Sequence, residues 1–481
     1  MKKKIFSYFF FIFIFLIIAF ITFKFDKDIL KNNKLNYKKC SDLNYKESLH
    51  LHPDNFKSIK LNMKILDYRE WSQILFEEEV LAKAAQLKFS SDIKVYSNRK
   101  RVKAIFEVNI DSKIKCSLLA NIRPHGDLED HRSSSSLPSL NVNITDGHLF
   151  GIVKFILFKP KTRNYDNEIL ASTLLKELNF LAPRTANFDI SHNKKIFKFI
   201  FQEKVEKEFI ENNSKIENPI YKGDERFTFI DRQRFAIEKT IFNHIFKPVN
   251  KNFISKDQNQ KFLTEVGLSI LNELALYYKG DVDEDDNFDF YSAGKKAGYN
   301  KNFDNFATFD ALLLSMNADH GLPPGNRRIY FDPVYKKFHP IYYDGMASLL
   351  GKNNDYVKQT VVKGINLKFK SKKNKIYRPG MFNGKAIISG VIGADKALEL
   401  ITKIDRKKLK AKLKLNGVTI SDVQLEKTLI GIDENLNILK NFKKDKIFQF
   451  KENLIPSIYI KSDFDYKNAL KKISYKKNLN R

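Results

Sequence analysis

The chain has 481 residues, of which 43% are hydrophobic and 29% charged, and its formal net charge is +29. This is enough apolar chain to bury a large core in two or three domains or lobes. The positive charge comes mostly from lysines spread along the whole chain, which fits either the drift of an AT-rich genome or a polyanion-binding surface. Because the chain has no DNA- or RNA-binding motif, we expect no nucleic-acid partner.

The first 25 residues predict a transmembrane anchor (1–25). Lys2, Lys3 and Lys4 precede an apolar run at 5–23, and a helix over that run would be about 28 Å long, close to the thickness of the hydrocarbon core. The leading lysines favour a cytoplasmic amino terminus. A cleaved signal peptide is the alternative, but the run ends in TFKFDKD without a small-residue cleavage site. We therefore expect a single-pass protein whose bulk is extracytoplasmic.

The segment 26–90 is predicted to be a membrane-proximal spacer that ends in an amphipathic helix, YREWSQILFEEEVLAKAAQL. The two cysteines, Cys40 and Cys116, lack the spacing of a metal site. In an oxidising compartment they could form one disulfide, and two unpaired thiols are an equally good interpretation.

The segment 91–210 is predicted to be a β-rich lobe. Alternating apolar residues mark the strands DIKVYSN, KAIFEVNI, KIKCSLLANIRPHGD, PSLNVNI and GIVKFILF, an antiparallel meander that the loop RPHGD at Arg123 interrupts. Lys154 sits inside GIVKFILF, where it either projects into a cleft to pair with a phosphate or lies on a solvent face. Lys159 and Lys161 are rival positions for the same role.

The clearest helix of the chain follows, in PKTRNYDNEILASTLLKELNFLAPRT. Asn164 or Asp166 is expected to cap it, and Glu168 lies in its first turn, where a negative charge favours the helix dipole. Glu168 therefore either has a capping role or reaches back to a strand lysine. Two strands, ANFDISH and KKIFKFIFQEKV, then form a hairpin. A small β-lobe that carries one helix and leads into further helices has the layout of a kinase amino-terminal lobe.

The segment 211–350 is predicted to be a C-lobe that contains the catalytic and metal-binding stretch. Helices dominate it from about 232 to 319, with the strong segments RQRFAIEKTIFNHIF, KFLTEVGLSILNELALYY and FATFDALLLSMNADH. The acidic run at 281–290 lacks the glycine and the glutamate of a calcium-binding loop, so we interpret it as an exposed loop. The segment 351–481 is predicted to be a basic helical extension. Its helices, in ADKALELITKIDRKKLKAKLKL and DVQLEKTLIGIDENLNILKNF, are expected to pack on or beside the larger lobe.

Most of the candidate catalytic and metal-binding residues lie in the stretch 317–345, NADHGLPPGNRRIYFDPVYKKFHPIYYDG. Its pattern predicts a loop, a strand, a turn, a second strand and a loop that opens at Asp-Gly. Asn326 then precedes the first strand and Asp344 ends the second, where an amide and a carboxylate can hold Mg²⁺. Asp319 could orient an attacking hydroxyl, and His320 beside it is either catalytic or structural. The same residue types are also the usual components of turns.

Four stretches between 121 and 345 resemble the CotH-like atypical kinases, the family of spore coat protein H. They are RPHGD, FILFKPKTRNYDNEILASTLLKELNFLAPRT, IFQEKVEKEF and MNADHGLPPGNRRIYFDPVYKKFHPIYYDG. The resemblance implies an α+β, atypical protein-kinase-like two-lobe fold after the transmembrane helix, with a β-rich N-lobe that carries one helix and a mainly helical C-lobe. It also implies ATP and Mg²⁺ as cofactors and a hydroxyl group as acceptor.

The resemblance also implies roles for individual residues, with Lys154 and Glu168 as an ion pair. The site that it implies consists of catalytic Asp319 and His320, metal-binding Asn326 and Asp344, and cofactor-binding Lys154, Glu168 and Arg123. Two departures from ordinary kinases stand out. The gap from Asp319 to Asn326 is longer than the corresponding gap, and HGD within RPHGD stands where a glycine-rich phosphate loop is expected.

The predicted function is that of a membrane-anchored kinase of the cell envelope, which transfers phosphate from ATP with Mg²⁺ to a protein or envelope-polymer hydroxyl. Because ATP is scarce outside the cytoplasm, the donor or the topology could differ from this expectation. Two alternatives stay open. One is a non-catalytic kinase-like scaffold of the envelope, and the other is a basic binder of acidic surface polysaccharide, whose affinity would fall steeply with salt.

Overall fold

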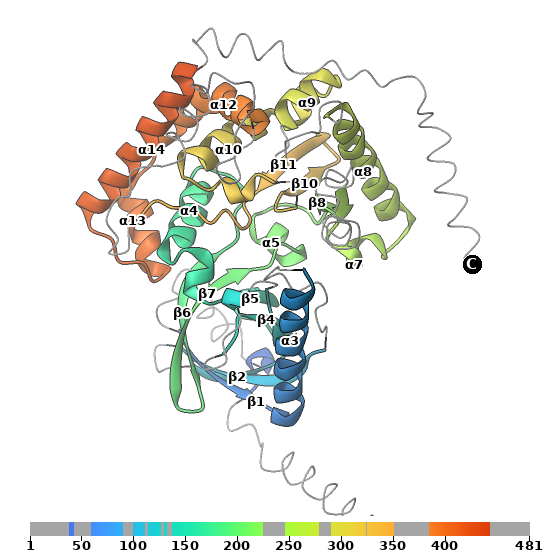
Figure 1. Cartoon of the computed structure of the whole chain (residues 1–481), viewed down its shortest axis with the longest axis vertical. Helices are drawn as coiled ribbons and strands as arrows, with labels where there is room; N and C mark the ends of the chain where they lie inside the picture. Colours follow the sequence, from blue (N-terminus) through green and yellow to red (C-terminus); the bar gives the residue numbers. More distant parts are fainter. Residues whose placement is uncertain are drawn as a thin grey trace, which may run out of the picture.

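The computed structural model describes residues 38–42, 59–89, 100–110, 114–126, 129–131, 137–224, 246–278, 290–323, 325–350 and 384–442. They form a mixed α+β fold, as predicted, in which a closed β-barrel is joined to a smaller sheet flanked by helices (Figure 1). The predicted membrane segment and almost all of the acidic run at 281–290 lie outside these residues. Among the helices that the structure describes, none combines the length and the apolar character needed to cross a membrane.

The barrel closes in the strand order β1-β2-β3-β4-β5-β7-β6. Its strands are β1 (Ile59–Ile65), β2 (Val102–Ile110), β3 (Ile114–Pro124), β4 (Leu140–Asp146), β5 (Lys154–Phe158), β6 (Thr185–His192) and β7 (Lys195–Glu203). Neighbours pair antiparallel except β1 and β6, which pair in parallel at Leu61 and Ile190 and close the barrel. The antiparallel meander is confirmed from β2 to β5, and its first predicted strand, DIKVYSN, lies outside the described residues. Strand β1 lies in a segment for which the sequence predicted no strand.

A disulfide ties the amino-terminal side of the described chain to the barrel. Cys40, in the short turn η1 (Cys40–Asp42), is bonded to Cys116 in β3, and their Cα atoms are 4.9 Å apart. The bond joins residues 76 positions apart, and in a chain-entropy treatment closing such a loop contributes about 4 kcal/mol of stability. The sequence allowed either one disulfide or two unpaired thiols, and the structure shows the disulfide.

Between β5 and β6 the chain leaves the barrel and forms the turn η4 (Pro160–Arg163) and the helix α4 (Asp166–Glu177). The helix was predicted, but neither Asn164 nor Asp166 is its N-cap. Tyr165 occupies that position, with a φ of 57° and no side-chain cap bond. The reason is that the Asp166 carboxylate accepts a hydrogen bond from the Asn187 amide of β6 at 2.7 Å, which fixes α4 on the barrel.

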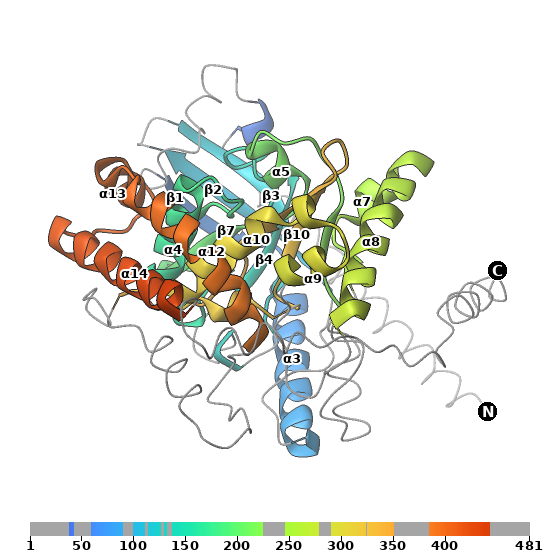
Figure 2. The ribbon, with the colours of Figure 1, turned by 90° about the horizontal axis from the view of Figure 1, so that it is seen from above.

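The second sheet has the strand order β11-β10-β8-β9. Its strands are β8 (Ile220–Gly223), β9 (Phe246–Pro248), β10 (Arg328–Asp332) and β11 (Lys337–Ile341). The remaining elements are α3 (Tyr68–Phe89), η3 (Glu129–His131), α5 (Lys207–Asn212), α7 (Lys251–Ile254), α8 (Gln258–Tyr278), α9 (Phe290–Lys296), η7 (Asn300–Asn302), α10 (Asp304–Ser315), η8 (Asp319–Gly321), α12 (Gly384–Thr402), α13 (Arg406–Leu415) and α14 (Asp422–Phe442). Helix α3 packs on the barrel, and one end of it extends beyond the other elements (Figure 2).

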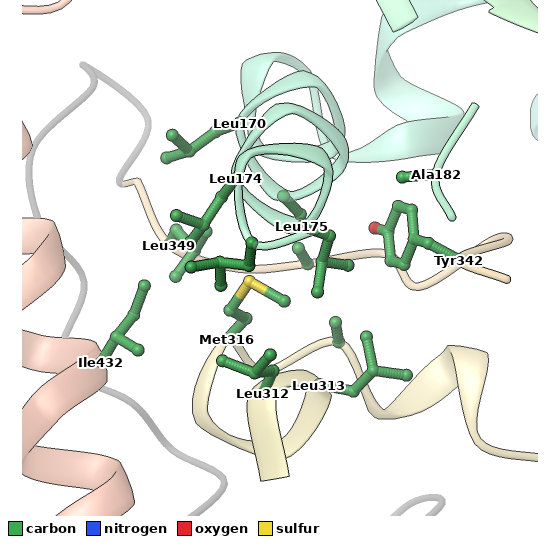
Figure 3. Close-up of a cluster of buried hydrophobic side chains, with 14 of the residues drawn as sticks. Leu170, Leu174, Leu175, Ala182, Leu312, Leu313, Met316, Tyr342, Leu349 and Ile432 are labelled. Carbon is green, nitrogen blue, oxygen red and sulfur yellow. The ribbon is translucent and has the colours of Figure 1, made fainter. Parts of the chain in front are cut away.

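A large hydrophobic core joins α4 to the helices of the second lobe. Figure 3 shows Leu174 and Leu175 of α4 beside Leu312 of α10 and Met316, the residue that follows α10, with Ile432 of α14 at the left of the view. The predicted packing of the carboxyl-terminal helices on the larger lobe is therefore confirmed. These helices also contact α4, because the lysines of α13 lie against the last residue of that helix.

Candidate functional site

The hairpin of β10 and β11 carries the two residues that were predicted to bind metal. Its strands pair antiparallel from Arg328 opposite Ile341 to Asp332 opposite Lys337. The chain just before β10 and the chain just after β11 therefore lie at the same end of the hairpin. Asn326 and Asp344 occupy these two positions, because the loop, strand, turn and strand expected from the sequence are all formed.

Asp344 sits in a turn with an unusual backbone. Its φ is 51°, in the left-handed region, which aspartate tolerates better than most residues. Its side chain is 16% exposed, and its Oδ2 lies 3.8 Å from His320 Nε2. The Asn326 amide donates a hydrogen bond to the carbonyl oxygen of His320 at 2.7 Å. His320 thus links the two predicted metal ligands, so three of the residues singled out in the sequence come together.

Asp319, predicted to be the catalytic base, begins the single turn η8 that also carries His320. Its carbonyl oxygen accepts a hydrogen bond from Leu322 N–H at 2.9 Å, which closes the turn. The side chain is partly exposed at the surface of the second lobe. Its carboxylate is therefore one residue from His320 and partly accessible to solvent.

A buried arginine that sequence reasoning missed pairs with Asp344. Arg163, the last residue of η4, places Nη1 3.1 Å from Asp344 Oδ1, and its guanidinium stacks on the Phe158 ring with Cζ 3.9 Å from the ring centroid. Arg163 Nε and Asp344 Oδ1 are both buried without a hydrogen-bond partner among the described residues. Arg163 lies inside the PKTRNYDNE segment that carries the family resemblance, but nothing in that segment marks it as a partner of Asp344.

Glu168 is buried in the same cluster. Its carboxylate accepts hydrogen bonds from Tyr342 Oη at 2.8 Å and from Gln202 Nε2 at 3.1 Å. Burial raises the pKa of Glu168 to about 7, with the Arg163 charge lowering it and the Asp344 charge raising it. Glu168, Arg163 and Asp344 therefore form one electrostatic unit at the junction of the barrel and the second lobe.

The predicted ion pair between Lys154 and Glu168 is wrong for this structure. Lys154 Nζ bonds instead to one carboxylate oxygen of Glu206, and Lys204 Nζ lies 2.9 Å from the other. The physical reason is the closure of the barrel. Lys154 begins β5, and its carbonyl oxygen accepts the backbone N–H of Lys204 just beyond β7, so that Glu206 becomes the nearest carboxylate.

The RPHGD loop adjoins the cluster from the barrel side. Arg123, at the end of β3, donates a hydrogen bond to the carbonyl oxygen of the following proline at 3.2 Å. Burial, with smaller contributions from Arg163 and Arg123, holds the pKa of His125 well below its ordinary value. Gly126 has a φ of 93°, and a Cβ there would lie 2.1 Å from the His131 ring. The loop thus requires glycine at this position, and its final aspartate lies outside the described residues.

A second buried pair fixes the loop that carries Asn326. Arg327 Nη1 lies 2.6 Å from Asp310 Oδ1 of α10, and the two side chains are 2% and 0% exposed. Arg327 Nε also donates to the carbonyl oxygen of Leu322 at 2.8 Å. The residue next to Asn326 is therefore anchored in the core of the second lobe, which restricts where the Asn326 amide can lie.

The side-chain types of Asn326 and Asp344 are among those that bind a magnesium ion. The described residues contain no cluster of three or more His, Cys, Asp or Glu side chains arranged to hold a metal, but Mg²⁺ is commonly held by one or two protein oxygens together with water and substrate phosphates. Asp344 Oδ1 is a buried oxygen that makes no hydrogen bond in the described chain, although Arg163 Nη1 lies 3.1 Å from it. The Asn326 amide nitrogen is engaged by His320, so its oxygen is the atom that faces away from that bond. The pair can supply two hard oxygen ligands.

No protein-family model and no curated protein matches the chain. Among solved structures, the chain is similar to the Helicobacter pylori proinflammatory kinase CtkA, with a TM-score of 0.30 and 13% sequence identity, over 65% of this chain and 95% of that one. A similarity of this size decides nothing about chemistry, so function has to be argued from the geometry of the site.

Proposed function

We propose that this chain is a CotH-like atypical kinase that transfers phosphate from ATP, with Mg²⁺, to a hydroxyl of a protein or of an envelope polymer. The observation that carries the proposal is the convergence on Asp344. His320 Nε2, on the loop before β10, lies 3.8 Å from Asp344, and the Asn326 amide bonds to the His320 carbonyl oxygen. Arg163 pairs with Asp344 from the segment after β5, and the charge of Asp344 acts on the nearby Glu168. A two-lobe arrangement in which one lobe supplies cations and the other supplies oxygen ligands is suited to phosphoryl transfer.

The roles follow from the chemistry of each group. Asn326 and Asp344 would hold Mg²⁺, which when bound neutralises charge on the transferred phosphoryl group. Asp319 would accept the proton of the attacking hydroxyl. Arg123 and Lys154 belong to the end of β3 and the start of β5, and their charges suit the phosphates of the nucleotide. Positioning and charge would provide most of the rate acceleration.

The proposal includes an extracytoplasmic location behind an amino-terminal anchor. The disulfide between Cys40 and Cys116 supports an oxidising compartment, since such bonds are rare in the cytosol. An envelope protein or polymer would then be the accessible acceptor.

One observation favours a second candidate, a non-catalytic kinase-like scaffold. Arg163 lies against Asp344, where a kinase would bind a metal cation. In a scaffold this ion pair would be permanent, whereas in a kinase Mg²⁺ would compete with the guanidinium for the same carboxylate. The two candidates therefore differ in whether Asp344 responds to metal.

The test is thermal unfolding of the full chain in detergent with ATP and Mg²⁺, for wild type and Asp344→Ala. A ligand that binds only the native state raises the unfolding midpoint, by the equivalent of about 2.7 kcal/mol at a hundred times its Kd. We expect a Mg²⁺-dependent rise that Asp344→Ala abolishes. Asp332→Ala, at the other end of the same hairpin, is the matched control and should keep the rise.

Two outcomes would contradict the kinase proposal. If no nucleotide raises the midpoint with any metal, the site does not bind a phosphate donor. If ATP raises the midpoint equally without metal and in Asp344→Ala, the chain binds nucleotide as a scaffold would.

A further inference from the structure

Tyr342 is held firmly just ahead of Asp344. It is fully buried. Its backbone N–H donates to the carbonyl oxygen of Leu181 at 2.8 Å, and its hydroxyl donates to Glu168 at 2.8 Å. Figure 3 shows the Tyr342 hydroxyl pointing toward α4, the helix that carries Glu168. The residue two positions before Asp344 is thus fixed at both its backbone and the tip of its side chain.

The turn at Asp344 lies directly on the Tyr342 ring. A Cβ added to Gly345 would lie 2.5 Å from Tyr342 Cε2 and 2.7 Å from its hydroxyl oxygen. No side chain fits between the turn and the ring. Gly345 therefore allows the backbone that carries Asp344 to rest on an aromatic surface whose position Glu168 determines.

The chain after the turn is held by the same helix. Asn167 Oδ1 accepts hydrogen bonds from the backbone N–H groups of Leu349 at 2.7 Å and Leu350 at 2.6 Å. Asn164 Nδ2 donates to the carbonyl oxygen of Ala347 at 2.7 Å. The residues around the start of α4 therefore contact the chain on both sides of the Asp344 turn.

We propose that Glu168 and Asn167 are positioning residues for the Asp344 carboxylate, Glu168 acting through Tyr342 before the turn and Asn167 through the backbone after it. The inference rests on the proposed function only in taking Asp344 as a metal ligand. It gives Glu168 a role different from the lysine pair expected of it. Burial of the Glu168 carboxylate is costly, and its hydrogen bonds from Tyr342 and Gln202 both fix its position and partly offset that cost.

The proposal is tested with Tyr342→Phe and Asn167→Ala in the full chain. The matched controls are Tyr330→Phe, which removes a buried hydroxyl that donates to the carbonyl oxygen of Ile216 at 2.9 Å, and Asn250→Ala, which removes a buried amide oxygen that accepts Ile220 N–H at 2.9 Å. Each control loses bonds of the same kind within the second lobe, away from Asp344. A merely structural effect should therefore be similar in both members of each pair.

Two measurements are made on all variants. The first is hydrogen exchange of the 343–350 segment in metal-free protein, which we expect to be at least about tenfold faster in the two test variants and unchanged in the controls. The second is the Mg²⁺ concentration that gives half of the ATP-dependent rise in unfolding midpoint. We expect this concentration to be about tenfold higher in the test variants, because a misplaced ligand binds metal less well.

The outcomes separate this inference from the proposed function. Faster exchange together with a raised Mg²⁺ requirement supports it. Suppose that wild type responds to Mg²⁺ and Asp344→Ala does not. If the two test variants then show unchanged hydrogen exchange, or an unchanged Mg²⁺ requirement, the positioning role is overturned and the proposed function stands. Faster exchange in a protein whose wild type shows no Mg²⁺ response overturns the metal-positioning role together with the proposed function.

Discussion

Two buried arginine–aspartate pairs stand near the site, and they differ in how completely the arginine is used. Arg327 lies 2.6 Å from Asp310, with both side chains almost inaccessible to solvent, and its Nε is bonded to a backbone carbonyl. Arg163 lies 3.1 Å from Asp344, which is 16% exposed, and its Nε has no hydrogen-bond partner in the described chain. The Arg327 guanidinium is thus the more completely bonded of the two, although Asp310 Oδ2, like Asp344 Oδ1, makes no hydrogen bond in the described chain.

The difference indicates which pair is structural. Breaking a fully buried ion pair leaves an unpaired charge in the core, so separating Arg327 from Asp310 would greatly lower the free energy of unfolding. Arg163 is also buried, but Asp344 is 16% exposed, so water or another cation can replace Arg163 as its partner. A carboxylate that can exchange its partner, such as that of Asp344, is suited to binding a metal. The Arg327–Asp310 pair, called the inner pair below, instead holds the loop that carries Asn326.

The largest expected effect comes from breaking the inner pair. Arg327→Met should lower the free energy of unfolding by about 3–5 kcal/mol, because it leaves the Asp310 carboxylate buried and unpaired. Urea unfolding at neutral pH measures this loss. The matched control is Arg163→Met, and an equal loss in the two variants would contradict the distinction between the pairs.

A smaller effect is expected from Glu168, whose carboxyl group lies near the Arg163–Asp344 pair. Its pKa is raised to about 7 by burial, so the stability of the folded state is greatest while Glu168 is protonated, below its ordinary pKa, and is lost as the pH rises through 7. Glu168→Gln should therefore become more stable than wild type by up to about 3 kcal/mol between pH 5 and 8. Urea unfolding of both proteins across this range measures the difference.

Glu177, at the other end of α4, provides the control for that prediction. Lys412 and Lys408 hold the pKa of Glu177 below its ordinary value, despite partial burial. Its ion pairs stabilise the fold above that pKa and are lost as the pH falls, so Glu177→Gln should be less stable than wild type at pH 8, with a smaller difference at low pH. If both variants changed in the same direction with pH, the sign assigned to Glu168 would be wrong.

The smallest expected effect on stability is that of Arg163→Met. We expect a loss of about 1–2 kcal/mol, from the ion pair and the stacking on Phe158. On the proposed function, removing a cation from Asp344 should also reduce the Mg²⁺ concentration needed for the ATP-dependent thermal shift several-fold. A Mg²⁺ titration of the shift measures this, and a raised requirement would mean that Arg163 helps to bind the donor instead.

The elements nearest the site could be predicted from the sequence because their signals are local. The aromatic and β-branched residues on either side of a turn predicted the hairpin that brings Asn326 and Asp344 to one end. The apolar spacing after NYDNE predicted α4, with Glu168 in its first turn. Each of these needs only neighbours a few residues away.

Partners distant in the chain could not be predicted in the same way. The sequence predicted that Lys154 pairs with Glu168, but the pairing of β5 with β7 places Glu206 beside Lys154 instead. Arg163 carries no pattern that distinguishes a buried partner of Asp344 from one of the many surface cations. Hydrogen bonds and ion pairs act over a few ångströms, so their partners are known only once the backbone is placed.

The sequence by itself determined the α+β class, the strands β2 to β7 of the barrel, helix α4 and the hairpin with its candidate ligands, because propensity and hydrophobic periodicity act between near neighbours. The tertiary structure decided the parallel closure of β1 on β6, the Cys40–Cys116 bond, and the convergence of Arg163 and Glu168 on Asp344. Tyr342 and Glu168 stand 174 residues apart in the chain, and only the packing of α4 between the barrel and the second lobe brings them within hydrogen-bond distance.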